Sequence, residues 1–225
     1  FILTFSAKAD TLPTLKGLNF DEKDAFVIEA NEGNDSICYW VKDSLVYQMD
    51  TLAIQVDYLY TDTLDQLVPK TDTLYLANKL TREQRDKLKK QEEEKKEKER
   101  KKREKKGEAP KPEPTLFLKM NVDAPSAFDI NRNVVLSFDE PLARIDTSSI
   151  HVSVKKDTLW VEKPFILVAD SVIPRRYEIL ADWQPDREYQ LKIDSTAITG
   201  LYGLHTNKVD QSFKVTKLDE YGTLF

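Results

Sequence analysis

Few residues in this chain have side chains suited to catalysis. Adjacent carboxylates occur at Asp139-Glu140, the two histidines are His151 and His205, and the single cysteine is Cys38. A glycosidase needs two carboxylates about 5–10 Å apart around the bond that breaks. Adjacent residues of a strand point to opposite faces of a sheet. We therefore interpret Asp139-Glu140 as the end of a strand rather than as an acid–base pair.

The histidines and the cysteine do not form a recognisable catalytic set. A serine hydrolase would have to use His151, on a predicted strand, or His205, in a polar turn, and no Ser lies in a Gly-x-Ser-x-Gly turn. Cys38 lies among aromatic residues, which predicts a buried thiol that packs as a small apolar side chain. With only 6 Gly, the chain also has little material for a phosphate-binding loop. The sequence predicts no catalytic residue, no cofactor and no enzyme.

Asp followed by Thr or Ser recurs along the chain. Asp-Thr-Leu occurs at residues 10–12, 50–52, 62–64, 72–74 and 157–159. An Asp side chain caps a turn through its own backbone, and Thr then enters the next strand. Calcium is the alternative, since Ca²⁺ takes roughly six to eight oxygen ligands. The chain has no Asp-x-Asp-x-Asp loop, so we expect capped turns and no metal site.

Aromatic residues make up 10% of the chain and include Trp40, Trp160 and Trp183. An exposed Trp can stack on a sugar or anchor a protein partner, whereas a buried one packs the core. These three residues are therefore the candidate contacts to a partner or a glycan, and core packing is the alternative for each.

A mainly β fold must position these residues. β-branched and aromatic residues alternate in many short runs separated by turn residues, which is typical of a sandwich. In one run, Ile37, Tyr39 and Val41 share a face, and Cys38 and Trp40 share the other. The predicted strands are 1–6, 25–30, 36–41, 52–60, 72–76, 115–122, 133–138, 149–154, 158–162, 165–169, 176–181, 188–193 and 211–216.

Two parts of the chain repeat one pattern. Residues 1–6 (Phe-Ile-Leu-Thr-Phe-Ser) match residues 134–139 (Val-Val-Leu-Ser-Phe-Asp), and residues 52–57 match residues 189–194. Residues 73–76 also parallel residues 212–215. This predicts two copies of one β domain, of which the first lacks the leading strand that the second has at 115–122.

The segment between the copies is basic and highly charged. Residues 79–106 hold 15 Lys/Arg and 8 Asp/Glu, a local charge of +7 in a chain of net charge −5, which leaves −12 for the rest. Thr81 and Gln84 fit a capping box, and acid-before-base pairs four residues apart, such as Glu92–Lys96, favour a solvated helix. Gly107 would end it, and three prolines follow, at 110, 112 and 114. The acidic remainder argues against nucleic-acid binding by the folded parts. Contact of the basic segment with anionic lipid or nucleic acid is the alternative to a plain spacer.

The predicted organisation is therefore two Ig-like β-sandwich domains joined by a long charged α-helical connector. The boundaries are 1–78 for the first sandwich, with its N-terminal strand missing, and 79–114 for the helix and Pro-rich linker. The second sandwich covers 115–217. Residues 218–225 are a tail or the start of a further module.

Residues 134–142 (Val-Val-Leu-Ser-Phe-Asp-Glu-Pro-Leu) resemble the first core strand of bacterial Ig-like domains of the S-layer-protein type. Residues 189–194 resemble the late strand of that family, and Gly203 the turn before its final strand. The chain as a whole resembles an internal fragment of the large Ig-like lipoproteins of Bacteroidota. The first copy departs from the pattern, because Ser6-Ala7-Lys8 replaces the acid and Pro.

This resemblance implies a location in the cell envelope, at the outer membrane, facing the periplasm or the outside, with the parent chain anchored by lipid. It implies a non-enzymatic structural and protein-interaction module, for example a subunit of an envelope assembly or export complex. The expected partners are envelope proteins such as an outer-membrane barrel, not nucleic acid. The alternative function is a glycan-binding surface module.

Overall fold

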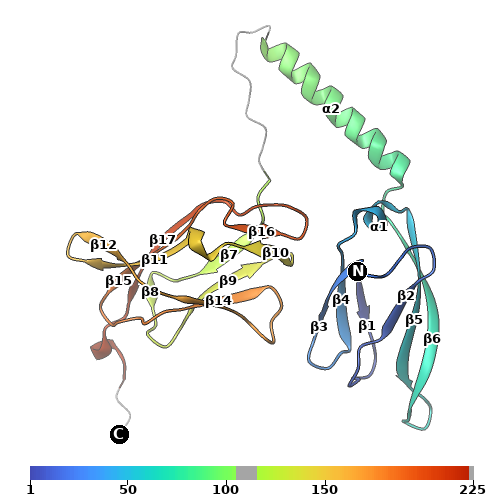
Figure 1. Cartoon of the computed structure of the whole chain (residues 1–225), viewed down its shortest axis with the longest axis horizontal. Coiled ribbons are helices and arrows are strands. Elements are labelled where there is room, and N and C mark those ends of the chain that lie inside the picture. The colour runs from blue at the N-terminus through green and yellow to red at the C-terminus, as the bar shows by residue number, and fades with distance from the viewer. Residues whose placement is uncertain (105–115, 223–225) are drawn as a thin grey trace. The chain divides into compact units, whose positions relative to one another are not determined.

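The computed structural model describes residues 1–104 and 116–222 (Figure 1). The described chain is mainly β, with several sheets, and is consistent with a β-sandwich. It divides into two compact units, Phe1–Thr115 and Leu116–Phe225.

Unit 1 holds two antiparallel three-stranded sheets, of order β1-β4-β3 and β2-β5-β6. Alternating apolar residues of β5, Leu52, Ile54 and Val56, are buried in its core. A short helix follows β4, and Asp43 caps it by accepting a hydrogen bond from the Leu45 N–H at 2.7 Å. The elements are β1 (Ile2–Thr4), β2 (Thr14–Gly17), β3 (Phe26–Ala30), β4 (Ser36–Val41), α1 (Ser44–Gln48), β5 (Thr51–Thr61), β6 (Leu67–Ala77) and α2 (Arg82–Glu104).

Unit 2 holds a sheet of order β13-β14-β9-β7, a sheet of order β12-β11-β15-β17-β8, and the separate pair β10-β16. Inward residues of β9, β11, β14, β15 and β17 meet in one core. The elements are β7 (Met120–Asp123), β8 (Ala127–Phe128), β9 (Val134–Phe138), β10 (Leu142–Ile145), η1 (Thr147–Ser149), β11 (Ile150–Lys156), β12 (Leu159–Glu162), β13 (Ile166–Ala169), β14 (Arg176–Leu180), β15 (Glu188–Ile193), β16 (Ile198–Gly200), β17 (Val209–Val215) and η2 (Leu218–Glu220).

Six strands pair in the same way in both units. In unit 1 the sheets are β1-β4-β3 and β2-β5-β6. In unit 2 the corresponding sheets are β9-β14-β13 and β11-β15-β17. Their strands come in the same order along the chain as those of unit 1 and pair with the corresponding antiparallel neighbours. One difference is the register of the last pair. In unit 1, Leu52 lies opposite Leu76. The sequence repeat matches Leu52 to Tyr189 and Leu76 to Val215, but Tyr189 lies opposite Phe213, two residues before Val215. A two-residue slip keeps every side chain on its face, so both cores tolerate it.

The predicted strands agree with the structure in most places, and the differences have local causes. Strands β2, β8, β10 and β16 and helix α1 were not predicted, because each is short. The strand predicted at 115–122 begins only at Met120, since the N–H of Leu118 instead donates to the carbonyl of His205 at 2.8 Å. The prediction that Cys38 is buried is wrong. Cys38 is half-buried, because the pleat places it with Trp40 on the outer face of β4.

Helix α2 contains the ion pairs Glu92–Lys96 and Glu97–Lys101, at 3.5 and 2.6 Å. Both were predicted from the four-residue spacing. The predicted helix stop at Gly107 and the prolines at 110, 112 and 114 lie outside the described residues.

Candidate protein-interaction site

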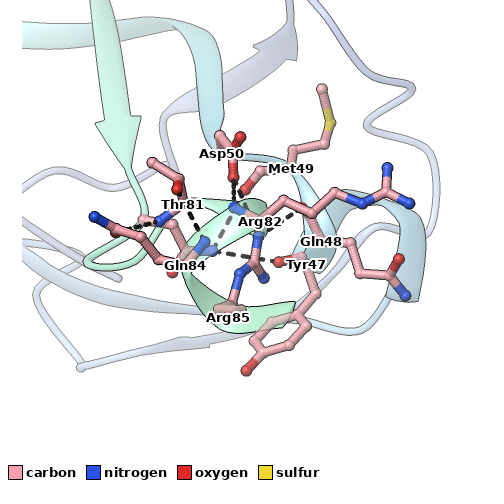
Figure 2. Close-up of polar contacts among 9 residues, drawn as sticks. Tyr47, Gln48, Met49, Asp50, Thr81, Arg82, Gln84 and Arg85 are labelled. Carbon is pink, nitrogen blue, oxygen red and sulfur yellow. Dashed lines mark hydrogen bonds and ion pairs between the residues drawn. The ribbon is translucent and has the colours of Figure 1, made fainter. Parts of the chain in front are cut away.

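The first turn of α2 is fastened to the body of unit 1 through Asp50 (Figure 2). One carboxylate oxygen of Asp50 accepts a hydrogen bond from the Arg82 N–H at 2.5 Å and lies 3.3 Å from Nη2 of Arg85. The same Arg85 nitrogen donates to the carbonyl of Gln48 at 2.8 Å. The Arg85 side chain is only 21% exposed. These contacts join the first turn of α2 to Gln48 and Asp50 of unit 1 through charge-assisted hydrogen bonds.

The predicted capping box lies in the same cluster and is confirmed. The N–H of Thr81 donates to the Gln84 side chain at 3.1 Å, and the N–H of Gln84 donates to the Thr81 hydroxyl at 3.3 Å. Just before it, the N–H of Asn78 donates to the Asp50 carbonyl at 2.8 Å, which continues the β5–β6 ladder to the foot of the helix. The end of the sheet and the start of α2 therefore form one hydrogen-bonded junction, which we call the helix clamp (Asp50, Thr81, Arg82, Gln84 and Arg85).

Unit 1 also contains a cavity of about 380 Å³ between the β1–β2 loop and the far ends of β5 and β6. Phe5, Tyr58 and Lys70 line it, and the rings of Phe5 and Tyr58 lie 5.0 Å apart. The Tyr58 hydroxyl donates to Asp72 at 2.6 Å, and the Lys70 ammonium lies 3.1 Å from the same carboxylate. The cavity therefore combines aromatic surface with charged groups.

The hydrogen bonds in this cluster shift the pKa values of its three ionisable groups. The bond from Tyr58 lowers the pKa of the Asp72 carboxyl, and Lys70 lowers it further. The same bond raises the pKa of the Tyr58 phenol, and the contact with Asp72 raises the pKa of Lys70. Asp72 is thus kept ionised and Tyr58 and Lys70 protonated across the neutral range.

The three predicted contact residues lie in different environments. Trp183 is 7% exposed and packs edge-on against Phe128, Tyr189 and Phe213 in the core of unit 2. Trp160 lies on β12 and is 38% exposed. Trp40, in unit 1, is half-buried and donates a hydrogen bond to Glu29 at 2.8 Å.

The other residues with reactive side chains each have their own polar contact. Asp139 lies 3.6 Å from Lys119, and Glu140 accepts a hydrogen bond from the N–H of Tyr202 at 3.4 Å. His151 lies on β11, as predicted, with Nδ1 3.1 Å from Glu162. His205 lies 3.0 Å from the Thr199 hydroxyl.

Several of the recurring Asp residues cap turns, as predicted, whereas Asp72 lies inside β6 and binds Tyr58 and Lys70 instead. The carboxylates of Asp62, Asp146 and Asp170 each accept a hydrogen bond from the N–H two residues later, at 2.8, 3.1 and 2.8 Å. Within residues 1–104 and 116–222, no three His, Cys, Asp or Glu side chains are grouped so as to hold a metal ion.

Sequence reasoning missed both the helix clamp and the Tyr58 cluster. Asp50 belongs to an Asp-Thr-Leu repeat and was interpreted only as a turn residue, and its contact with Arg85 spans 35 residues. A signal for the cluster was present, because Lys70 and Asp72 are polar at positions that share a strand face with the apolar Leu74 and Leu76.

No family model matches the chain, and no curated protein matches its sequence. In the part of the chain that the structure describes, no helix has both the length and the apolar character to cross a membrane.

Proposed function

We propose that the chain is a non-enzymatic structural and protein-interaction module of an outer-membrane lipoprotein. In this proposal two Ig-like sandwiches are joined by a long charged helix that sets the distance between them. The envelope location, the lipid anchor of the parent chain and the envelope protein partners rest on the family resemblance of residues 134–142 and 189–194.

The strand order supports the Ig-like assignment. An Ig constant-type sandwich has strands A, B, E and D in one sheet and C, F and G in the other. In unit 2, β7-β9-β14-β13 takes the first order and β11-β15-β17 the second. In unit 1, β1-β4-β3 and β2-β5-β6 take the same orders without strand A. Tyr189, near the start of strand F, accepts from the N–H of Gln184 at 2.8 Å and donates to the carbonyl of Asp182 at 3.3 Å, which is the tyrosine corner of Ig-like domains.

The observation that carries the spacer role is the helix clamp. An isolated charged helix without an apolar stripe is marginal in water, and a helix on a loose hinge would set no distance. Here the first turn of α2 is bonded to Asp50 and Gln48 of the sheet unit. Over its 23 residues the helix rises about 34 Å.

The spacer role is tested by inserting four residues after Lys95. Four glycines break the helix, whereas four alanines extend it by about 6 Å. Spin labels at Leu45→Cys in unit 1 and Leu159→Cys in unit 2, with Cys38→Ser, report the distance between the units. Both labelled side chains are exposed in the structure, at 74% and 70%. We expect a broader and shorter distance distribution with glycines and a shifted, equally narrow one with alanines. Identical distributions for both insertions would refute the spacer role.

Glycan binding is the second candidate, and the cavity at Phe5, Tyr58 and Lys70 favours it. Ligand sites combine an apolar wall with a few polar groups in cavities of roughly 300–1,000 Å³, and a sugar ring stacks on aromatic faces while its hydroxyls bond to such groups. Saturable binding of envelope polysaccharide that Tyr58→Ala abolishes and Trp160→Ala leaves unchanged would favour this function over the first.

A further inference from the structure

The turn between β13 and β14 carries two exposed aliphatic side chains at its tip. It consists of residues 171–175, Ser-Val-Ile-Pro-Arg. The side chain of Val172 is 70% exposed and that of Ile173 is 47% exposed. Turns favour Gly, Pro, Asn, Asp and Ser, because these residues adopt or cap the turn backbone. Backbone geometry therefore does not account for two neighbouring β-branched residues at this tip.

Unit 1 provides an internal comparison, because its β3–β4 turn has the same place in the strand order. In both units, a phenylalanine N–H donates to the last carbonyl of this turn, Phe5 to Asp35 at 2.8 Å and Phe138 to Arg175 at 3.0 Å. The turn of unit 1 is nevertheless polar, with Glu-Gly-Asn-Asp at residues 32–35. The fold therefore accepts a polar turn here, and the apolar tip is a particular feature of unit 2.

The residues on either side of the tip hold it in one conformation. The Asp170 carboxylate accepts hydrogen bonds from the N–H groups of Val172 and Ile173, at 2.8 and 2.9 Å. The N–H of Asp170 donates to the carbonyl of Arg176 at 2.8 Å and closes the turn. A segment that is already ordered loses less conformational entropy when it binds. The two aliphatic side chains are therefore presented on a preorganised support.

The same end of unit 2 carries cations and an exposed tyrosine. Arg175 has a φ of +61°, which long side chains rarely adopt, and its guanidinium donates to the Asp139 carbonyl at 2.9 Å. Lys119, whose side chain is 83% exposed, lies 3.6 Å from the Asp139 carboxylate. Glu140 accepts a hydrogen bond from the N–H of Tyr202, which is 48% exposed. The apolar tip therefore lies beside positive charge, and both carboxylates there have partners.

We propose that this turn enters a lipid surface, with Val172 and Ile173 among the acyl chains and Lys119 and Arg175 at the phosphate groups. Surface-bound segments place apolar side chains about 5–10 Å into the boundary between headgroups and acyl chains, and attraction to anionic lipid strengthens their binding. Tyrosine is enriched at the headgroup level, which fits Tyr202. A projecting tip suits a fluid acyl layer, because that layer adapts to its shape, whereas a protein would need a complementary pocket. The inference goes beyond the proposed function, which names protein partners only.

Vesicles of equimolar phosphatidylethanolamine and phosphatidylglycerol test the proposal with the full chain. Val172→Asp should lower vesicle affinity at least tenfold, because a carboxylate replaces an inserted side chain. Leu159→Asp is the matched control, since Leu159 on β12 is equally exposed, at 70%, and the change in charge is the same. Binding through the basic residues of α2 falls as salt rises, and both variants alter it alike. Equal affinities for the two variants would overturn the proposal. No vesicle binding by the unaltered chain would also overturn it, in favour of a protein pocket as the occupant.

Insertion depth gives an independent measurement in the chain carrying Cys38→Ser. A fluorophore at Ser171→Cys should be quenched by lipids with brominated acyl chains, whereas one at Thr158→Cys, in the exposed β11–β12 turn, should not. Equal quenching at both positions would contradict insertion of the tip. Hydrogen exchange of β9 and β14 peptides checks that unit 2 still folds in each variant. The spacer experiment contains no lipid, so its outcome is separate from this one.

Discussion

Replacing Trp183 separates a core tryptophan from a binding one. Its side chain is 7% exposed and contacts three aromatic rings, with centroids 5.0–5.5 Å away. Burying a Trp removes about 150–250 Å² from water, and truncating a buried aromatic residue to Ala costs about 3–5 kcal/mol. We expect Trp183→Ala to lower the free energy of unfolding of unit 2 by that amount.

Two further variants provide the scale for this value. Trp160 is 38% exposed on β12, with the Lys155 ammonium 5.7 Å above its ring. Trp160→Ala should therefore cost only about 1 kcal/mol. Trp183→Phe keeps most of the packing and removes an indole N–H that is buried and makes no hydrogen bond among the described residues. We expect it to cost about 1–2 kcal/mol, which is below the cost of the Ala variant.

The assay has to report on unit 2 alone, because the chain contains two compact units. Hydrogen exchange of β15 and β17 peptides across a urea series gives the opening free energy of that unit, while β5 peptides serve as the internal control. If Trp183→Ala costs no more than Trp160→Ala, the packing argument is refuted. Loss of polysaccharide binding by Trp183→Ala without a change in exchange would assign it to a glycan site instead.

Two other predictions concern unit 2. Tyr189→Phe removes the hydroxyl that bonds to Gln184 and Asp182 and leaves the Gln184 N–H without its protein acceptor, so urea unfolding should show a loss of about 1 kcal/mol. Tyr75→Phe, exposed, should show none. Hydrogen bonds from the N–H groups of Ile173 and Val172 lower the pKa of the Asp170 carboxyl in the folded state. The ionised carboxylate therefore stabilises the fold above the unfolded-state pKa of about 3.9. This stabilisation is lost as the pH falls through the folded-state pKa. Asp170→Asn should therefore lose less stability between pH 7 and pH 3 than the unaltered chain, and an equal loss would contradict this assignment.

The short-range features were predictable because their causes lie within a few residues. The capping box at Thr81 and Gln84, the turn-capping Asp residues and the two faces of β4 each depend on neighbours in sequence. The apolar run of residues 134–138 and the alternation of residues 188–193 also located the central strands, since a period of two fixes which side chains of the second face the core.

The candidate sites were not predictable in this way, because each joins residues that are distant in sequence. Asp50 lies beside Arg85, and the ring of Phe5 lies beside that of Tyr58. Such contacts depend on which strands become neighbours, and a single sequence does not specify that.

The sequence by itself determined a mainly β chain, a repeated strand pattern and a charged helix, because alternation, turn chemistry and charge spacing act locally. The tertiary structure decided that Trp183 is enclosed while Trp160 is exposed, and that the first turn of α2 is hydrogen-bonded to Asp50 and Gln48 of unit 1. The physical reason is that burial, long-range hydrogen bonds and sheet edges are properties of how strands pack together, and not of any one strand.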